Sequence, residues 1–297
     1  MNPDTKLGMI GVGLMGHGIA KNLLQKGFTL TFLDHPGNQP VDDLLQLGAK
    51  QANSCEQVAA RSDIVLICVT GSPQAQTVLL GDNGVVHGLR PKSVVIDCST
   101  IEPHITTQLA QAVQARDCEY LDAPLTRTPK EAEAGLANTM VGGNAETFAR
   151  LRPIFDAYCE NVYHTGAVSS GHAMKLLHNF ISLGNCLLLA EAVTCAAKCG
   201  IARETLLEIL TSGGGDSTAL KRLTPYLLEG DSNSFRFSLG NSKKDLGYYK
   251  NFAEHLGTAS HMASAAAAML EAAVRPDDAA RPLPELIDLL LVKPGRS

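Results

Sequence analysis

Short apolar runs alternate with helix-period patterns over the first 165 residues of the chain. The strand-like runs cover residues 7–10, 29–33, 63–69, 93–98, 120–123, 138–141 and 162–165. Between them, segments such as residues 14–25 place apolar side chains at helical spacing. This alternation predicts βαβ units, and therefore an α/β domain of the Rossmann type with a mostly parallel sheet, over residues 1–165.

The strand signal stops after residue 165. Residues 170–199 form a long apolar-rich segment without proline, and shorter helical patterns follow it. We therefore expect an all-α C-terminal domain over residues 166–297, joined to the sheet domain by a long helix. Residues 181–197 are apolar on nearly every side, which favours burial on both sides and a contact between subunits.

The glycine pattern after the first predicted strand indicates a dinucleotide. In G-x-G-x-x-G, the first glycine allows a tight turn, the second lets backbone approach a pyrophosphate, and the third lets helix and strand pack closely. The following helix N-terminus would hold the diphosphate through its free N–H groups, although glycine-rich turns also occur without nucleotides. The expected cofactor-binding residues of this loop are Gly11, Val12, Gly13, Leu14, Met15 and Gly16.

Asp34 indicates which dinucleotide is bound. It follows the second predicted strand, 18 residues after Gly16. A carboxylate near this spacing hydrogen-bonds the ribose 2′-OH of NAD, whereas the 2′-phosphate of NADP needs a nearby arginine, and His35, Pro36 and Gly37 offer none. We expect NAD rather than NADP. The alternative is that Asp34 only forms the turn after the strand.

Two further loops follow predicted strands, at the edge where a doubly wound sheet binds its ligand. Val69 and Thr70 would pass beneath the cofactor, and Thr100 could face the nicotinamide. A threonine shortly before Glu102 and Pro103 could instead be an ordinary helix cap.

A third loop carries two hydroxyl groups around an arginine. Thr126, Arg127 and Thr128 follow the strand-like run at residues 120–123. Such a group suits an anionic head such as a carboxylate, sulfonate or phosphate. The alternative is a solvated arginine in a surface loop.

The predicted long helix carries candidate acid/base chemistry. Lys175 and Asn179 are four residues apart and so share one helix face. Burial lowers the pKa of a lysine, so Lys175 among apolar neighbours could exchange a proton near neutral pH. The alternatives are a lysine that points to water and an asparagine that hydrogen-bonds a neighbouring helix.

The composition of the chain indicates which kinds of partner it binds. A net charge of −5 and a pI near 6.0 argue against a nucleic-acid surface and favour small molecules. The eight cysteines contain no C-x-x-C pair and no secretory leader precedes them, which fits buried thiols in a reducing cytoplasm. Glu191 and Lys198 interrupt the longest apolar segment, so we expect no membrane span, and no His or Cys spacing indicates a metal.

Four motifs together resemble the β-hydroxyacid dehydrogenase family, which includes 3-hydroxyisobutyrate dehydrogenase and tartronate semialdehyde reductase. They are the glycine loop with Met15, the Asp122-Ala123-Pro124 loop, the Gly171-x-x-x-Lys175-x-x-x-Asn179 helix and Lys244-Asp245-Leu246-Gly247. The resemblance covers nearly the whole chain. It implies that Lys175 is the catalytic acid/base, that Asn179 orients the substrate, and that Lys244 approaches nicotinamide and substrate across the cleft. It also implies a 6-phosphogluconate dehydrogenase-like C-terminal domain and a homodimer or homotetramer.

Two departures from the family pattern bear on the substrate. Where the family usually reads D-A-P-V-S-G-G, this chain has Thr126 for the serine and Arg127 and Thr128 for the two glycines. The arginine–threonine pair is similar to sulfolactaldehyde reductase, in which the loop receives a sulfonate. His178 stands where many relatives have a second asparagine.

The expected reaction is reversible, NAD-dependent oxidation of a short β-hydroxy acid, such as 3-hydroxyisobutyrate, to its semialdehyde. Reduction of a sulfonated or hydroxylated semialdehyde, sulfolactaldehyde or tartronate semialdehyde, is the main alternative. An imine-reducing relative is disfavoured by Lys175, which such relatives usually lack, and a decarboxylating relative by the short chain. The pair Lys175 and Asn179 disfavours a non-catalytic dinucleotide-binding sensor.

Overall fold

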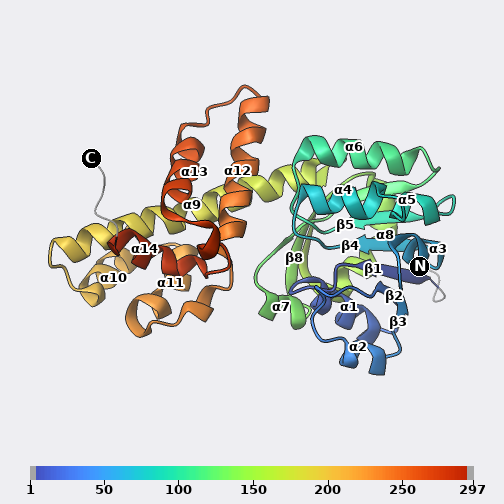
Figure 1. The fold of residues 1–297 in the computed structure, drawn as a ribbon, viewed down its shortest axis with the longest axis horizontal. Coiled ribbons are helices and arrows are strands. Elements are labelled where there is room, and N and C mark those ends of the chain that lie inside the picture. Colours follow the sequence, from blue (N-terminus) through green and yellow to red (C-terminus); the bar gives the residue numbers. More distant parts are fainter. Residues whose placement is uncertain (1–4, 293–297) are drawn as a thin grey trace. The chain divides into compact units, whose positions relative to one another are not determined.

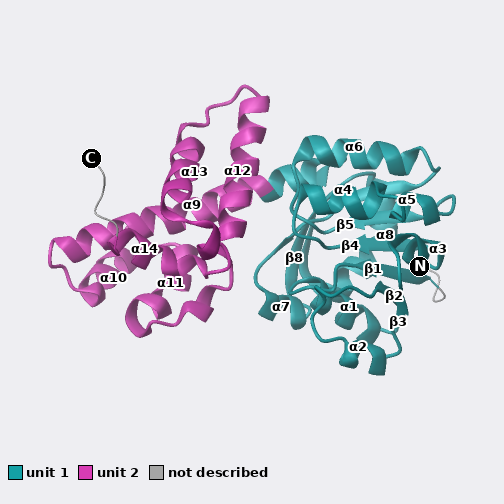
Figure 2. Ribbon diagram, in the orientation of Figure 1, with its two compact units in different colours: residues 1–175 teal, residues 176–297 magenta. Residues whose placement is uncertain are grey.

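The structure is a computed structural model that describes residues 5–292. The chain divides between Lys175 and Leu176 into two compact units (Figure 2). The hydrophobic pattern placed the boundary ten residues earlier, after residue 165, because the pattern changes where the last strand ends. The first turn of the next helix still packs in unit 1: a Cβ on Gly171 would lie 2.4 Å from the backbone oxygen of Met140.

Unit 1 contains one sheet of nine strands within residues 5–175 (Figure 1). The strands are β1 (Lys6–Ile10), β2 (Thr29–Leu33), β3 (Lys50–Ala52), β4 (Ile64–Ile67), β5 (Val94–Asp97), β6 (Glu119–Asp122), β7 (Leu125–Thr126), β8 (Ala137–Gly142) and β9 (Cys159–Gly166). Their order is β3-β2-β1-β4-β5-β6-β8-β7, and β9 pairs with β8. The strands from β3 to β6 pair in parallel, whereas β6 and β7 pair antiparallel with β8. The predicted Rossmann-type, mostly parallel sheet is confirmed.

Helices cover both faces of this sheet. They are α1 (Gly16–Gln25), α2 (Asp42–Gln46), α3 (Cys55–Ala60), α4 (Ser72–Leu80), α5 (Val85–Gly88), α6 (Pro103–Gln114), α7 (Pro129–Glu133) and α8 (Ala145–Tyr158). Successive strand residues point to opposite faces, so Leu66 packs with α1, α2 and α8, while Val65 and Ile67 pack with α3 to α6. Figure 1 shows α4, α5 and α6 on one side of the sheet and α1 and α2 on the other.

The order of the strands indicates the edge of the sheet at which a ligand binds. From β1 the chain proceeds to β2 and β3 on one side and to β4, β5 and β6 on the other. In doubly wound sheets the ligand lies outside the carboxyl ends of the strands at this reversal. The loops after β1 and β4 are therefore the expected neighbours of a dinucleotide.

Helices are the regular elements of unit 2 within its described residues, apart from an isolated β-bridge between Ser238 and Pro282, as the predicted all-α domain requires. Its helices are α9 (Ser170–Lys198), which begins in unit 1, α10 (Arg203–Ser212), α11 (Thr218–Glu229), α12 (Leu239–His255), α13 (His261–Ala273) and α14 (Leu286–Val292), with short 3-10 helices η1 (Ser232–Phe235), η2 (Pro276–Asp278) and η3 (Leu283–Glu285). Leu187 of α9, Leu223 of α11 and Leu246 of α12 share one core. The hydroxyls of Ser217 and Ser238 cap α11 and α12.

Helix α9 is more apolar than Glu191 and Lys198 suggested in the sequence. Within residues 5–292 it is the one helix whose length and composition would suffice to cross a membrane, with a window of mean hydropathy 1.7. Core helices of soluble proteins have the same properties, and side chains of α9 such as Leu183 and Val193 contribute to the core of unit 2.

The expectation of buried thiols is only partly correct. All eight cysteines are free, and four of them, Cys98, Cys118, Cys159 and Cys186, are buried. Cys55 and Cys68 are partly exposed. Cys195 and Cys199 are exposed, and they lie in the last turn of α9 and directly after it.

Candidate active site

Each glycine of the loop after β1 has a distinct environment. Gly11 has φ +91°, and a Cβ there would lie 2.2 Å from the backbone oxygen of Cys68 at the end of β4. A Cβ on Gly16 would lie 1.9 Å from the backbone oxygen of Gly11. A Cβ on Gly13 would meet nothing within 4 Å. Gly11 and Gly16 are therefore required by the fold, whereas Gly13 leaves open space where a ligand can approach the backbone.

The start of α1 fits an anion. Its N-cap, Met15, makes no side-chain capping hydrogen bond, and Leu14 beside it is exposed. Val12 is buried, and its oxygen accepts the N–H of Gln39 at 2.8 Å. That bond fastens the loop after β2 to the glycine loop. The uncapped N–H groups and the open backbone suit the diphosphate of a dinucleotide.

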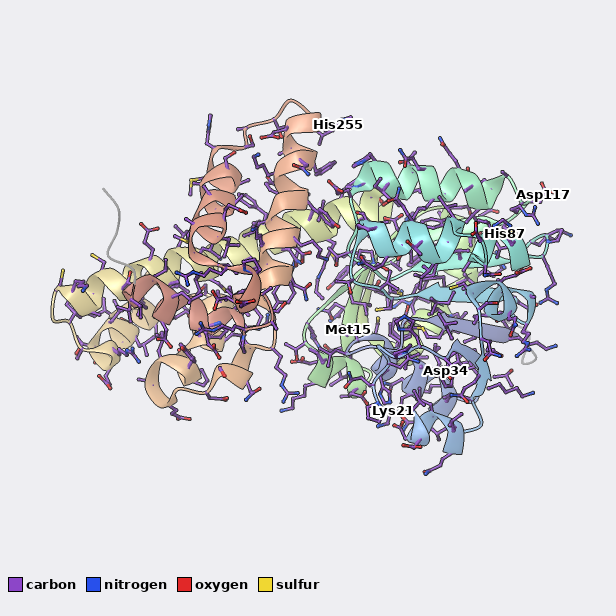
Figure 3. The ribbon with its side chains drawn as sticks, viewed as in Figure 1. Met15, Lys21, Asp34, His87, Asp117 and His255 are labelled. Atoms are coloured by element: carbon purple, nitrogen blue, oxygen red, sulfur yellow. The ribbon has the colours of Figure 1, made fainter. Side chains whose placement is uncertain are left out.

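Asp34 lies in this fastened loop. Its N–H donates to the oxygen of Ala52 at 2.9 Å, which fixes its backbone at the end of β2, and its side chain is exposed. Figure 3 labels Asp34 and Met15, both in unit 1. A carboxylate at this strand end suits a ribose hydroxyl.

A buried hydrogen-bond chain holds the loops after β4 and β5. Val69 donates its N–H to Ser99 Oγ at 3.0 Å, and Ser99 donates its N–H to Asp97 Oδ1 at 2.9 Å. Tyr120 donates its hydroxyl to Asp97 Oδ2 at 2.8 Å. Burial and the Asp97 carboxylate raise the pKa of Tyr120 well above its usual value, so the hydroxyl stays a donor. This chain fixes the backbone around Val69 and next to Thr100.

Thr100 is not a helix cap. Helix α6 begins after Glu102, which is its N-cap residue, and the N–H of Glu102 donates to Ser72 Oγ at 3.1 Å. The alternative reading of Thr100 as a capping residue is therefore wrong. Thr70 and Thr100 both follow parallel strands at the ligand edge of unit 1.

Asp122 fixes the start of α9. Its Oδ1 accepts the N–H of Ser169 and its Oδ2 accepts the N–H of His172, both at 2.8 Å, and the carboxylate is fully buried. A carboxylate at a helix N-terminus satisfies free N–H groups and faces the positive end of the helix dipole. The aspartate of the Asp-Ala-Pro loop therefore positions the turn that precedes Lys175.

Lys175 is buried and its ammonium is held. The residue is 8% exposed, and Nζ donates to the backbone oxygen of Leu125 at 2.6 Å. The alternative of a lysine pointing to water is therefore wrong. Burial and Asp97 raise the pKa of the Cys68 thiol to about 12, and the positive charge of Lys175 opposes this rise. Lys175 thus lies near the carboxyl ends of β4 and β5 and beside the Thr126 loop.

The loop with Arg127 is shaped by its own contacts. Thr126 is buried in β7, and Arg127 has φ +77°, a conformation that glycine adopts most easily. The Arg127 guanidinium donates to the oxygen of Leu136 at 2.7 Å and forms an ion pair with Glu160. Arg127 is therefore not a solvated surface arginine, and its role toward a substrate anion stays a prediction.

Thr128 begins a helix. It is the N-cap of α7 and forms a capping box with Glu131, whose carboxylate accepts the Thr128 N–H at 3.0 Å and also its hydroxyl proton. The predicted anion-binding loop is thus continuous with a defined helix, which fixes its end.

Within unit 2, Asn179, Asp245 and Lys244 come together. Asn179 Nδ2 donates to Asp245 Oδ2 at 2.6 Å, and both residues are buried. Lys244 Nζ is 3.0 Å from Asp245 Oδ1 and 5.4 Å from the centroid of the Tyr248 ring. His178 Nδ1 is 3.0 Å from Asn179 Oδ1. Asn179 therefore does bond a neighbouring helix, α12, and that bond also fixes the orientation of its amide.

Comparison with known proteins identifies the chain's relatives. The family model for the NAD binding domain of 6-phosphogluconate dehydrogenase matches residues 6–166. The family model for the NAD-binding region of NADP-dependent 3-hydroxyisobutyrate dehydrogenase matches residues 169–290. The chain is 32% identical over 248 residues to 2-(hydroxymethyl)glutarate dehydrogenase of Eubacterium barkeri, covering 83% of this chain and 82% of that protein. The chain belongs to the β-hydroxyacid dehydrogenase family.

Other relatives agree with this membership. NAD-dependent L-serine dehydrogenase of Pseudomonas aeruginosa is 30% identical over 267 residues, covering 88% of this chain and 89% of that protein. A crystal structure of 3-hydroxyisobutyrate dehydrogenase from Salmonella typhimurium superposes with a TM-score of 0.85 at 29% identity, covering 96% of this chain and 100% of that one. Membership of this family makes the chain an NAD(P)-dependent enzyme that acts on hydroxy acids.

Two buried aspartates, Asp122 and Asp245, position residues of the candidate site. Neither Asp122 nor Asp245 was assigned a role from the sequence, although both stand in the quoted family motifs. Each aspartate stands in an apolar segment or within a family motif, and this could have indicated its role. A carboxylate that is buried in such a segment needs hydrogen-bond partners.

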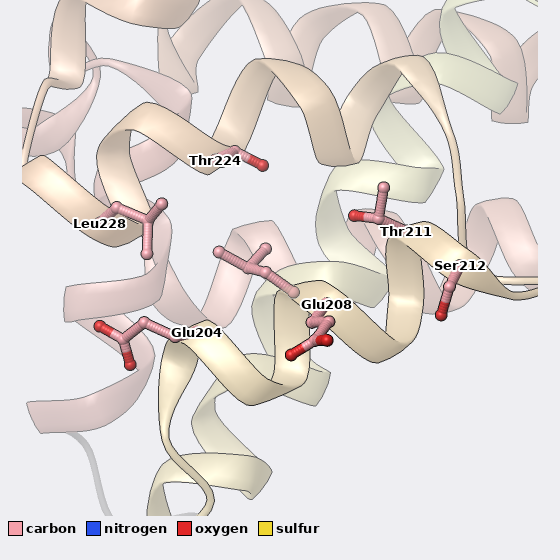
Figure 4. Close-up of a pocket in the computed structure, with 7 residues that line it drawn as sticks. Glu204, Glu208, Thr211, Ser212, Thr224 and Leu228 are labelled. Carbon is pink, nitrogen blue, oxygen red and sulfur yellow. The ribbon is translucent and has the colours of Figure 1, made fainter.

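A shallow hollow of about 410 Å³ lies in unit 2 on α10 and α11 (Figure 4). It is lined by Glu204, Leu207, Glu208, Thr211, Ser212, Thr224 and Leu228. None of the predicted site residues of this β-hydroxyacid dehydrogenase lines it, so it is separate from the candidate site.

Proposed function

We propose that this dehydrogenase reversibly oxidises a short β-hydroxy acid of the 3-hydroxyisobutyrate type to its semialdehyde, with NAD as cofactor. The names of the relatives support the substrate class. 2-(Hydroxymethyl)glutarate, L-serine and 3-hydroxyisobutyrate all carry a primary alcohol on the carbon next to the one that bears the carboxylate. The observation that carries the proposal in this chain is the buried Lys175 ammonium, held by the Leu125 oxygen beside the Thr126 loop.

Lys175 is the proposed acid/base. In the oxidation direction, neutral Nζ removes the proton from the substrate hydroxyl, and in reduction the ammonium returns it. Bound NAD supplies the hydride chemistry. Asp122 keeps the start of α9 in place, so that Nζ stays at the ligand edge of unit 1. The chain's own contribution is position and a proton.

Other residues are proposed to bind the two ligands. Asp34 would hydrogen-bond the ribose, and its exposed carboxylate at the end of β2 supports NAD over NADP. Gly13 and the uncapped start of α1 would hold the diphosphate. Asn179, oriented by Asp245, would orient the substrate, and Lys244 would approach both ligands.

The Thr126 loop would bind the acidic head. Thr126 and Thr128 offer hydroxyls and backbone N–H groups, and Arg127 adds a guanidinium that is already paired with Glu160. An arginine in place of glycine supports a second candidate, reduction of a sulfonated semialdehyde, because a guanidinium binds the oxygens of an anionic head such as a sulfonate. Reduction of a hydroxylated semialdehyde stays within the same candidate class.

A substrate panel tests the proposal. Purified protein would be incubated with NAD or NADP and 3-hydroxyisobutyrate, L-serine, 3-hydroxypropionate, glycerate, threonate or 2,3-dihydroxypropanesulfonate, with absorbance of the reduced cofactor as readout. Turnover of 3-hydroxyisobutyrate, L-serine or 3-hydroxypropionate with NAD supports the main proposal. Turnover of glycerate alone or of the sulfonate alone supports the second candidate, and NADH binding without turnover of any compound contradicts both.

Substitution of Lys175 tests the mechanism. We expect Lys175→Ala to lower kcat at least about a hundredfold, the usual size of an acid/base contribution, while NADH still binds. Lys175→Arg should be equally inactive, because arginine keeps the charge but does not release its proton. Exposed Lys198 lies on the same helix, so Lys198→Ala is the matched control. Unchanged turnover of Lys175→Ala would remove Lys175 from the mechanism.

A further inference from the structure

Three charged side chains from three helices of unit 1, Lys21, Asp43 and Glu133, meet around His17. Its Nδ1 is 2.5 Å from Glu133 Oε1 of α7, and its Nε2 is 3.0 Å from Asp43 Oδ1 of α2. Lys21, one turn further along α1, is 3.3 Å from Glu133 Oε2 and 3.5 Å from Asp43 Oδ2. Lys21 is labelled in Figure 3. The His17 side chain is only 10% exposed, so water has little access to the ring.

The two contacts of the His17 ring involve both of its nitrogens. Each ring nitrogen faces a carboxylate oxygen, and a carboxylate only accepts hydrogen bonds. A neutral imidazole has a single N–H, so only the doubly protonated ring donates to both Glu133 and Asp43. Although burial acts to raise it, the hydrogen bond and charge of His17 leave the pKa of Asp43 below its usual value, which keeps that carboxylate ionised. The carboxylate of Glu133 raises the pKa of Lys21.

His17 stands between the two binding loops. It is the second residue of α1, and its N–H donates to the oxygen of Gly13 at 2.9 Å. Glu133 is the last residue of α7, which begins at the Thr128 cap of the predicted anion-binding loop. The ring therefore connects the helix that follows the glycine loop with the helix that follows the Thr126 loop.

The backbones of α1 and α7 lie against each other at this point. A Cβ on Gly18 would lie 2.5 Å from the backbone of Ala132, so α7 is in close contact with α1. Asn22 Nδ2 donates to the oxygens of Ala132 and Glu133 at 3.1 and 3.2 Å. Helix α7 has only five residues, so these contacts and the His17–Glu133 contact, rather than its own hydrogen bonds, determine where it lies.

We propose that His17 is a positioning residue, which fixes α7 against α1 and thereby holds the Thr126–Thr128 loop beside the glycine loop. This inference rests on the proposed function, in which that loop receives the acidic head of the substrate. His17 is not among the residues proposed to bind either ligand. It sets the distance between the parts of unit 1 that bind the cofactor and the acid.

Hydrogen exchange and kinetics together test this role. In the ligand-free protein, His17→Ala should raise backbone amide exchange in residues 126–136 by about tenfold, because α7 loses its strongest side-chain contact to α1. In turnover with the best panel substrate, the apparent KM for the acid should rise about tenfold while kcat and the Kd of NADH stay within about twofold.

The cluster offers its own controls. Glu133→Ala should raise exchange at least as much as His17→Ala, because it also removes the ion pair with Lys21, whereas Glu133→Gln keeps an oxygen acceptor for the ring and should restore most of the protection. The double variant His17→Ala/Glu133→Ala should be no worse than Glu133→Ala alone, because both substitutions remove the His17–Glu133 contact. Asp43→Asn changes the other side of the ring and should leave exchange in residues 126–136 near the native rate.

Two results would overturn the inference. One is native exchange in residues 126–136 of His17→Ala. The other is increased exchange with an unchanged KM for the acid, which would make the cluster a purely structural contact. Exchange is measured without substrate, so the position of α7 is decided even if the substrate panel gives no turnover and the proposed function fails.

Discussion

At the scale of single residues, the glycine loop separates what the fold requires from what a ligand requires. Gly11 and Gly16 have backbone atoms where a side chain would begin, whereas Gly13 has open space there. A methyl group at position 13 therefore fits the protein alone and occupies the place where a diphosphate would approach.

We expect Gly13→Ala to leave the melting temperature within about 2 °C of the native value, since no contact is strained, and to weaken NADH binding at least about tenfold. Differential scanning fluorimetry and NADH fluorescence titration measure the two effects. Gly11→Ala is the contrasting variant, and its positive φ and close approach to Cys68 should destabilise the fold. Native NADH affinity in Gly13→Ala would show that the diphosphate lies elsewhere.

Single-residue roles could be predicted where they depend on nearby residues in the chain. The glycine loop and Asp34 were found because turn, helix start and strand end follow one another at fixed spacing. The pairing of Arg127 with Glu160, and of Asn179 with Asp245, joins residues 33 and 66 positions apart. Such pairs depend on which strands and helices become neighbours, and the hydrophobic pattern does not specify that.

At the scale of elements, α9 depends on a carboxylate from another element. Asp122 at the end of β6 accepts two backbone N–H groups from the first turn of α9. The sequence predicts the length of this helix, since residues 170–199 contain no proline, but it gives no indication that β6 caps it. The short strands β3 and β7 were also missed, because three and two residues are too few to show a period.

Asp122→Asn should lower the free energy of unfolding by about 1–3 kcal/mol, because an amide accepts one of the two N–H groups and turns its own N–H toward the other. Turnover should fall as well, since Lys175 follows one turn later. Urea denaturation and kcat measure these effects. Asp156→Asn is the control, because Asp156 forms an exposed pair with Arg152 within one helix. Equal stability of the two variants would contradict the capping role.

At the scale of the whole molecule, α9 presents an exposed apolar stripe. Met174, Leu177, Ile181 and Leu188 are 39%, 40%, 63% and 55% exposed and recur at spacings of three, four and seven residues. Side chains at these spacings lie on one side of a helix. A second copy of the chain is the occupant that we propose, which agrees with the expected homodimer or homotetramer.

Ile181→Glu should convert the oligomer to a smaller species, because a buried carboxylate without a partner opposes association. Size-exclusion chromatography with light scattering measures the mass. Ile209→Glu is the matched control, since Ile209 is 62% exposed on α10, away from the stripe. A native protein that is monomeric at micromolar concentration, or an Ile181→Glu variant of native mass, would contradict the proposed interface.

The backbone at Arg127 has a consequence for how this enzyme could diversify. Its φ of +77° is a conformation that glycine reaches without cost and that other residues reach only at about 1 kcal/mol or more. The backbone of this turn therefore suits glycine as well as arginine, and only the contacts of the guanidinium with Leu136 and Glu160 depend on the side chain. An exchange of arginine and glycine at this position would change the chemistry of the loop without requiring a new backbone conformation.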